Sequence, residues 1–290
     1  MPENTSQRQI LFSVLAVMGA MLSIGFGASL AKTLFSSVGP LGTAAYRITT
    51  GAMILLIWFR PWRWVTSRAD WQRILPYGAM LAMMNLLFYA ALDTLPVGVA
   101  IAIEFTGPLA LAIFSSRRAV DFLWAALAVL GLLLLTPVLS ADQPLDPTGV
   151  VLALGAGAFW AAYIVLGRRA SHLRAGQVTG LGMTAAAAMA LPFGIAQAGA
   201  ELLNPSLLAT GLFVGLLSSA IPYTLEMHAL RYLPTKTFGV TVSVEPMFGA
   251  IAGAIILSET LSLAQILAIG CIMAASAGCT ATAMRQAKRS

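Results

Sequence analysis

Ten long apolar runs separated by short polar segments restrict this chain to one class of protein. Each run holds about 20 residues, which is the length of α-helix that crosses the hydrocarbon core of a bilayer. The connecting segments are too short to hold a soluble domain. We therefore predict an all-α integral membrane protein with ten transmembrane helices. The predicted helices cover Ile10–Ala31, Pro40–Phe59, Ile74–Leu92, Val97–Phe114, Phe122–Leu139, Gly149–Leu166, Gln177–Gln197, Ser206–Ala229, Phe238–Leu257 and Leu261–Met284.

The shortage of charged residues excludes a soluble protein of this length. Only 10% of the residues are charged and 59% are hydrophobic, whereas soluble domains carry about 25% charged residues. The net charge of +6 does not indicate a nucleic-acid partner, because the basic residues occur in short groups between the apolar runs. Such groups are typical of membrane proteins, in which they fix the orientation of the chain.

The distribution of Lys and Arg predicts which side of the membrane each connecting segment faces. If the N-terminus is cytoplasmic, 15 of the 17 Lys and Arg residues lie in cytoplasmic segments. Lys32 is the one basic residue left on the opposite side, and Arg47 falls inside the second run. Since basic residues favour cytoplasmic segments, we predict that both termini are cytoplasmic.

The chain also contains an internal repeat. The stretch GVAIAIEF at Gly98–Phe105 aligns without a gap with GVTVSVEP at Gly239–Pro246. Just upstream of each stretch, ALDTLP matches ALRYLP. The alignment places Glu104 opposite Glu245, so the same carboxylate occurs once in each half of the chain.

Residues 10–139 and 149–284 are therefore predicted to form two repeats of five helices each. Because five is an odd number, the second repeat must enter the membrane from the opposite side. Inverted repeats of this kind occur in secondary transporters, where the substrate site lies near the midplane between the two halves.

Four charged residues lie within the apolar runs or near their ends, namely Arg47, Glu104, Glu226 and Glu245. A charge at the centre of a membrane helix costs at least about 2.5–3.5 kcal/mol on insertion scales, and such residues face a bundle interior or an aqueous cavity. Glu104 and Glu245 would approach the midplane from opposite sides. They are candidates for proton carriers or for acceptors of a substrate amine. Alternatively, each only bonds a neighbouring helix or caps a helix break.

Arg47 and Glu226 each allow two interpretations. The guanidinium of Arg47 is a fork suited to a carboxylate. It can therefore hold the carboxylate of a zwitterionic amino acid, or form an internal salt bridge with a glutamate. Glu226 is near the cytoplasmic end of its run, where it can belong to a proton relay or simply extend toward the interface.

Two prolines and a group of polar-edged side chains complete the candidate site. Pro108 removes the N–H that would bond the carbonyl of Glu104, and Pro246 does the same to Val242. Such breaks are tolerated at membrane depth where the backbone faces protein or a wet cavity; a packing kink is the alternative. The side chains that can line the cavity, or only pack between helices, are Asn85, Tyr89, Trp160, Tyr163 and Tyr223.

Motifs for catalysis or for cofactor binding do not occur in the sequence. It holds no Gly-rich phosphate loop, no cluster with metal-ligand spacing and no nucleophile–base spacing. Cys271 and Cys279 lie about 12 Å apart along one predicted helix and cannot pair with each other. We therefore expect neither an enzyme, nor a cofactor, nor a metal site.

Longer stretches resemble a known family. The block YLPTKTFGVTVSVEPMFGAIAGAIILSETLS, in a chain of ten spans in two halves, resembles the EamA-type members of the drug/metabolite transporter superfamily. The stretches GVAIAIEFTGPLALAIFSSRRAVDFLWAALAVLGL and VLALGAGAFWAAYIVLGRRA are similar to the bacterial inner-membrane threonine/homoserine exporters. One position departs from the repeat pattern: the acidic SET turn of the second half holds Glu259, and the first half has Arg118 there. We attribute this exchange to topology signalling.

The resemblance implies a multi-pass protein of the bacterial inner membrane that exports small neutral amino acids in exchange for protons, by alternating access. Its partners would be the amino-acid substrate, protons and membrane lipid; no oligomeric state follows from the sequence. The residues alone support a transporter but do not name threonine. A carrier of another metabolite or drug from the same superfamily is one alternative, and an intramembrane enzyme or lipid-binding structural protein is the other.

Overall fold

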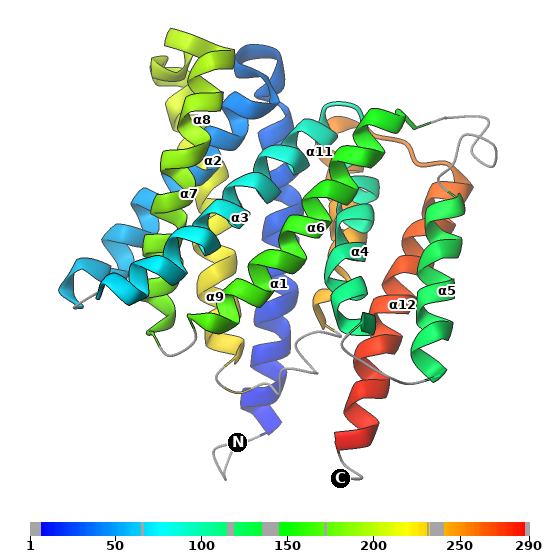
Figure 1. Cartoon of the computed structure of the whole chain (residues 1–290). Helices are drawn as coiled ribbons and strands as arrows, with labels where there is room; N and C mark the ends of the chain where they lie inside the picture. The colour runs from blue at the N-terminus through cyan, green and yellow to red at the C-terminus, as the bar shows by residue number, and fades with distance from the viewer. Residues whose placement is uncertain are drawn as a thin grey trace.

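The computed structural model describes residues 7–64, 67–114, 119–134, 145–170, 173–230, 232 and 241–287 of the 290-residue chain. The regular elements in these ranges are all helices, as predicted (Figure 1). The α-helices are α1 (Gln7–Lys32), α2 (Phe35–Phe59), α3 (Arg68–Leu92), α4 (Val97–Phe114), α5 (Ala119–Leu134), α6 (Pro147–Arg169), α7 (Ala175–Ala198), α8 (Pro205–Gly215), α9 (Ile221–Leu230), α11 (Glu245–Leu257) and α12 (Leu263–Ala287). Three short segments of other helix types are η1 (Pro61–Arg63), η2 (Gly199–Leu203) and η3 (Leu216–Ala220).

Within the described ranges, the predicted apolar runs fall largely on these helices; residues 135–139, at the end of the fifth run, lie outside those ranges. Helices α1, α2, α3, α6 and α7 are the five in the described ranges that are long and apolar enough to cross a membrane. Five shorter apolar segments lie on α4, on α5, on α8 with η3, on α11 and on α12. The ends differ from those predicted: α2 begins at Phe35 instead of Pro40, and α11 begins at Glu245 instead of Phe238. Residues 238–240, at the start of the latter run, lie outside the described ranges.

A kink near the start of α2 explains why the sequence pattern placed this helix later. Gly39 has φ +68°, a conformation that glycine adopts without steric cost, and Pro40 follows it. The kink leaves the N–H groups of the next turn without helical acceptors. Gln197 of α7 supplies one, since its Oε1 accepts hydrogen bonds from the N–H groups of Leu41 (2.7 Å) and Gly42 (3.1 Å). The first and second halves are therefore tied together at this point.

Contacts between the two halves have pseudo-two-fold symmetry: they are reproduced when each helix is swapped for its counterpart in the other half. Helix α1 packs on α9 and α11 of the second half, and α6 packs in the same way on α3 and α4 of the first. Helix α2 pairs with α7, α4 with α11, and α5 with α12. In Figure 1, the α5–α12 pair and the α2–α7 pair stand at opposite edges of the bundle. Replacing each helix by its counterpart in the other half reproduces these contacts, as expected for a repeated sequence.

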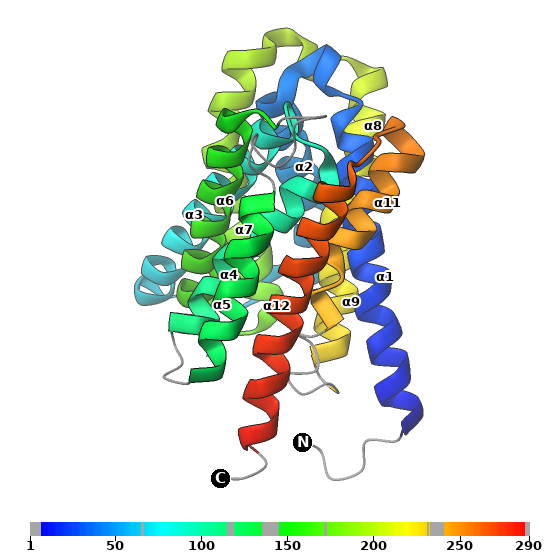
Figure 2. The same ribbon diagram turned by 90° about the vertical axis from the view of Figure 1, so that its right-hand side faces the viewer.

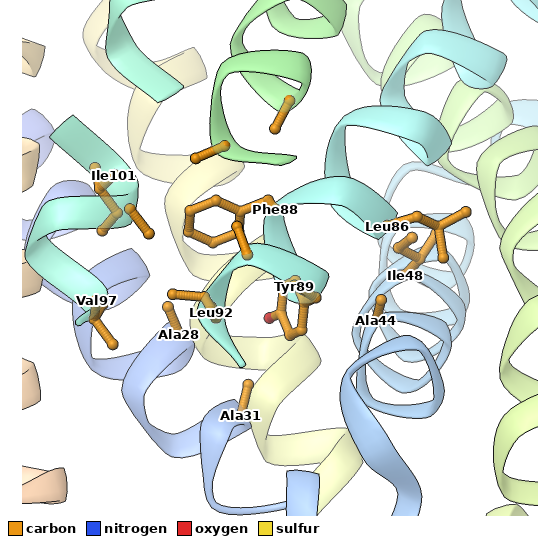
Figure 3. Close-up of a cluster of buried hydrophobic side chains, with 14 of the residues drawn as sticks. Ala28, Ala31, Ala44, Ile48, Leu86, Phe88, Tyr89, Leu92, Val97 and Ile101 are labelled. Carbon is orange, nitrogen blue, oxygen red and sulfur yellow. The ribbon is translucent and has the colours of Figure 1, made fainter. Parts of the chain in front are cut away.

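The main buried cluster contains residues of α1, α2, α3, α4, α6, α7, α8 and α12. Figure 3 shows the small side chains of Ala28 and Ala31 on α1 close to the larger Tyr89 and Leu92 on α3. All four are buried. Helix α1 begins and α12 ends at the same end of the bundle (Figure 2).

Candidate functional site

Arg47 is held between the two halves of the chain. It lies on α2 and donates hydrogen bonds from Nη1 to Oδ1 of Asn85 on α3, and from Nη2 to the carbonyl oxygen of Ser218 on η3 (3.0 Å). Its guanidinium carbon lies 5.7 Å from the centre of the Tyr89 ring, a distance at which a cation is attracted to the ring face. The Nε atom has no hydrogen-bond partner in the described part of the chain.

Segment η3 is a π-helix between α8 and α9, and it supplies backbone acceptors to the site. Its geometry is set by the hydrogen bond from the N–H of Ile221 to the carbonyl of Leu216, five residues earlier. The carbonyl of Leu217 accepts a hydrogen bond from Ser23 on α1 (2.6 Å), and that of Ser218 accepts from Arg47. Single π-helical turns within α-helices often occur at functional sites. We did not predict Ser218 from the sequence, although two adjacent serines inside an apolar run were a visible signal.

Buried hydroxyl groups lie beside the guanidinium. Tyr89 is fully buried, and its hydroxyl faces that of Ser218, which is 2% exposed. Neither oxygen forms a hydrogen bond of good geometry with another described residue, nor does Ser219 Oγ, which lies on the other side of η3 against α2. Most buried polar groups in proteins are hydrogen-bonded. Hydroxyls left without such bonds beside Arg47 are suited to a polar ligand.

Three carboxylates, one from the first half and two from the second, interact with Arg47 or with one another. Glu104 on α4 is 7% exposed, and Glu245, the first residue of α11, is 8% exposed. The two carboxylates interact electrostatically with each other and with Arg47. Glu226 on α9 is half-buried and interacts with Glu245. Arg47 therefore interacts with Glu104 and Glu245, two of the three intramembrane glutamates that the sequence singled out, and Glu226 interacts with Glu245.

The internal salt bridge considered for Arg47 is not formed in this conformation. Among the described residues, no carboxylate oxygen lies within 4.0 Å of its guanidinium nitrogens. Arg47 instead uses neutral acceptors, the amide of Asn85 and a backbone carbonyl. Its positive charge is therefore not neutralised by direct contact, and it remains available to an anionic group.

The aromatic candidates divide between two locations. Trp160 on α6 meets the ring of Phe105 edge-on, with centroids 5.1 Å apart, and Phe105 adjoins the central glutamate of α4 in the sequence. Tyr163, one turn further along α6, instead accepts a hydrogen bond from the hydroxyl of Tyr77 on α3 (2.8 Å). Tyr223 belongs to α9, and its side chain lies outside the described part of the structure.

The two prolines occupy different positions in their helices. Pro108 lies inside α4, and the carbonyl of Glu104, which Pro108 leaves without a helical donor, lies against Gly157 of α6. Pro246 lies in the first turn of α11, where the missing N–H has no helical partner to lose. Glu245 therefore begins that helix, at the end where the helix dipole favours a negative charge.

We expect the close contact at Gly157 to be sensitive to a single methyl group. A Cβ at this position would lie 2.5 Å from the carbonyl oxygen of Glu104, so Gly157→Ala must push α4 away from α6. Overpacking of this kind costs about 1–3 kcal/mol, and we expect a lower melting temperature of the detergent-solubilised protein. Gly270→Ala on α12 is the matched control, because nothing lies within 4 Å of a Cβ there. Equal melting temperatures for the two variants would contradict the expectation.

Comparison with known proteins agrees with this architecture. The profile of the EamA-like transporter family matches the chain twice, at residues 11–137 and 147–280. A solved crystal structure superposes with a TM-score of 0.63 over 96% of this chain and 99% of the other. Its sequence is 19% identical, so this likeness concerns the fold alone.

Several relatives are similar over nearly the whole chain. The threonine/homoserine exporter RhtA of Salmonella typhimurium (strain LT2) is 48% identical over 286 residues, which is 99% of this chain and 97% of the relative. RhtA of Escherichia coli (strain K12) is 46% identical over 288 residues, 99% and 98% of the two chains. The resemblance noted in the sequence is confirmed, and the chain is a multi-pass membrane transporter and not an enzyme. It belongs to the EamA-like transporter family of the drug/metabolite transporter superfamily.

Proposed function

We propose that this protein exports small neutral amino acids of the threonine and homoserine type across the bacterial inner membrane. The observation that carries the proposal is the meeting of one guanidinium and buried carboxylates from both halves of the chain. A zwitterionic amino acid presents one anionic and one cationic group at a fixed spacing, so it needs both kinds of partner. Relatives that are 46–48% identical are named as threonine/homoserine exporters.

In the proposed complex, the Arg47 fork binds the substrate carboxylate and Glu104 accepts the substrate ammonium, alone or with Glu245. The hydroxyls of Tyr89 and Ser218 would bond the side-chain hydroxyl of threonine or homoserine. A site that hydrogen-bonds a substrate hydroxyl strongly rejects analogues that lack it, because its buried polar groups are then left unpaired.

For the topology, we propose ten transmembrane spans in two inverted repeats, 10–139 and 149–284, with both termini cytoplasmic. The pseudo-two-fold symmetry of the contacts between the halves supports the repeat. The location of the start of α1 and the end of α12 at one end of the bundle (Figure 2) supports an even number of crossings. The distribution of Lys and Arg supports the orientation.

Transport would proceed by alternating access, with the two halves rocking about the Arg47 site. Proton antiport would use Glu104, with its proton shared with Glu245. A proton that binds from outside removes the negative charge that holds the ammonium, and the substrate then leaves. The same proton is released to the cytoplasm before the next substrate binds.

Counterflow in proteoliposomes tests the proposal directly. Vesicles loaded with unlabelled threonine should accumulate labelled threonine and homoserine, at pH 6 and at pH 8. We expect threonine to compete well, and valine, which replaces the hydroxyl by a methyl group, to compete at least about tenfold less. Efflux of cationic drugs without any amino-acid counterflow would favour the alternative, a drug or metabolite carrier of the same superfamily.

A further inference from the structure

A network of polar contacts joins the end of α1 to the connection between α11 and α12. The Nζ atom of Lys32 lies 2.8 Å from Oε1 of Glu259 and also donates a hydrogen bond to the carbonyl of Leu95 (2.8 Å). The other carboxylate oxygen of Glu259 accepts a hydrogen bond from the N–H of Val97 (2.9 Å). The two charged side chains are only 20% and 14% exposed.

This network holds three chain segments at once. Lys32 ends α1, while Leu95 and Val97 lie at the connection from α3 to α4; all three belong to the first half. Glu259 belongs to the second half. The N–H of Val97 is one of the first-turn donors of α4 that lack a helical acceptor, and a carboxylate is favoured there. Because the pair is largely shielded from water, salt screens it less than an exposed surface pair.

Close packing continues from the network toward the centre of the bundle. A Cβ at Gly98 of α4 would lie 2.6 Å from Cβ of Ala250 on α11, and one at Gly25 of α1 would lie 2.9 Å from the backbone of Phe248. Figure 3 shows Val97 and Ile101 of α4 beside this region. Helices α1, α4 and α11 are thus in near-backbone contact between the Lys32–Glu259 network and the centre of the bundle.

The first repeat has a basic residue at the position where the second repeat has Glu259. The position that aligns with Glu259 in the first half is Arg118, which lies outside the described residues. A basic residue at that position cannot supply the carboxylate that a second ion pair of this kind would need. We attributed this difference between Arg118 and Glu259 to topology signalling. It also means that the first repeat lacks the acidic member of such an ion pair.

We propose that Lys32 and Glu259 form the external gate of the transporter. The ion pair holds the two halves together on the extracytoplasmic side while the Arg47 site communicates with the cytoplasm. It separates when the site opens outward, and α4, which carries Glu104, is then released at Val97. This assignment rests on the proposed export function and orientation, in which Lys32 faces the outside.

Cysteine labelling from outside the cell tests the gate. Ile101, which is 1% exposed and one turn deeper on α4 than Val97, is changed to Cys in a chain with Cys271→Ser and Cys279→Ser. An impermeant maleimide is then added to intact cells. We expect Lys32→Met and Glu259→Gln each to speed labelling by about tenfold, the factor that corresponds to about 1.4 kcal/mol. The Gln side chain keeps an acceptor for the N–H of Val97, so Glu259→Gln isolates the loss of the ion pair.

Arg73→Met is the matched control, since Arg73 pairs with Asp70 at 3.8 Å on the N-terminal turns of α3, outside the Lys32–Glu259 network. It should leave the labelling rate unchanged. The exchanged variant Lys32→Glu with Glu259→Lys should return the rate most of the way to that of the parent chain, because the attraction is restored while the bonds to Leu95 and Val97 are not. This rescue would show that the faster labelling of the single variants comes from loss of the attraction between the two side chains.

Equal labelling rates in the parent, Lys32→Met and Glu259→Gln chains would overturn the gate. Acceleration seen only with reagent supplied from the cytoplasmic side would overturn its external placement. Threonine counterflow by the unsubstituted chain is measured alongside. Its absence would count against the proposed export function, while the labelling rates would still report on the gate.

Discussion

Replacing Glu104 by Gln is expected to abolish export driven by a pH gradient while leaving some threonine counterflow. Gln keeps the size and hydrogen-bonding capacity of the side chain but can neither release a proton nor carry a negative charge. Net export against a gradient should then fall to the level of protein-free vesicles, because no proton movement accompanies the substrate. Exchange of labelled for unlabelled threonine needs no net proton movement, so it should persist with weaker binding. The measurement compares both modes in the same proteoliposomes.

Glu201→Gln is the control for this experiment. Glu201 is an exposed carboxylate on η2, and its loss removes the same charge from the chain without touching the site. It should transport like the unsubstituted protein. Full gradient-driven export by Glu104→Gln would end its role as proton carrier, and the same assay on Glu245→Gln would then show whether the second carboxylate carries the proton.

Replacing Arg47 by Lys is expected to weaken binding of amino acids although the positive charge is kept. Lys cannot present two N–H groups in a fork, so it cannot bond Asn85 and the Ser218 carbonyl while also meeting a carboxylate. Hydrogen bonds to charged groups contribute about 1.5–3 kcal/mol each, and losing one corresponds to a fall in affinity of roughly 10- to 150-fold. The concentration dependence of threonine counterflow measures this change.

A substrate without a carboxylate separates binding from folding in the Arg47 variant. Threoninol has the ammonium and hydroxyl groups of threonine but lacks the carboxylate, so the unsubstituted protein should bind it far more weakly. Arg47→Lys should reduce the difference in affinity between threonine and threoninol, because the Lys side chain binds the carboxylate less well than the Arg side chain. Arg73→Lys, at the pair with Asp70 on α3, should leave the preference for threonine over threoninol unchanged. An Arg47→Lys protein that still prefers threonine by the original factor would show that another residue binds the carboxylate.

Much of the fold and part of the site could be predicted because the governing signals are local. A run of about 20 apolar residues has few alternatives to a membrane helix. A charge such as Glu104 inside such a run is costly for reasons that do not depend on its partner. The repeated GVAIAIEF and GVTVSVEP stretches likewise show, by alignment alone, that Glu104 and Glu245 occupy equivalent positions in the two repeats.

The ends of helices and the roles of the prolines were harder to predict. Gly39 and Pro40 suggest a helix start, but α2 begins earlier and bends there because Gln197 of α7 satisfies the freed N–H groups. Pro246 suggested a break within a long run; residues 241–242 are helical, residues 243–244 form a turn, and Pro246 then lies in the first turn of α11. Neither helix end follows from the neighbouring residues. The α2 kink depends on an acceptor supplied by α7, and the start of α11 depends on where the preceding turn ends.

By itself, the sequence determined that this is a helical membrane protein built from two related halves, and it singled out Arg47 and the intramembrane glutamates as exceptional. These conclusions need only hydropathy, length and internal similarity. Tertiary structure alone decided that Arg47 bonds Asn85 and the carbonyl of Ser218 and not a carboxylate. It also decided that Lys32 meets Glu259, 227 residues away. The physical reason is that hydropathy depends on each residue and its neighbours along the chain, whereas a hydrogen-bond partner is chosen by how distant helices pack.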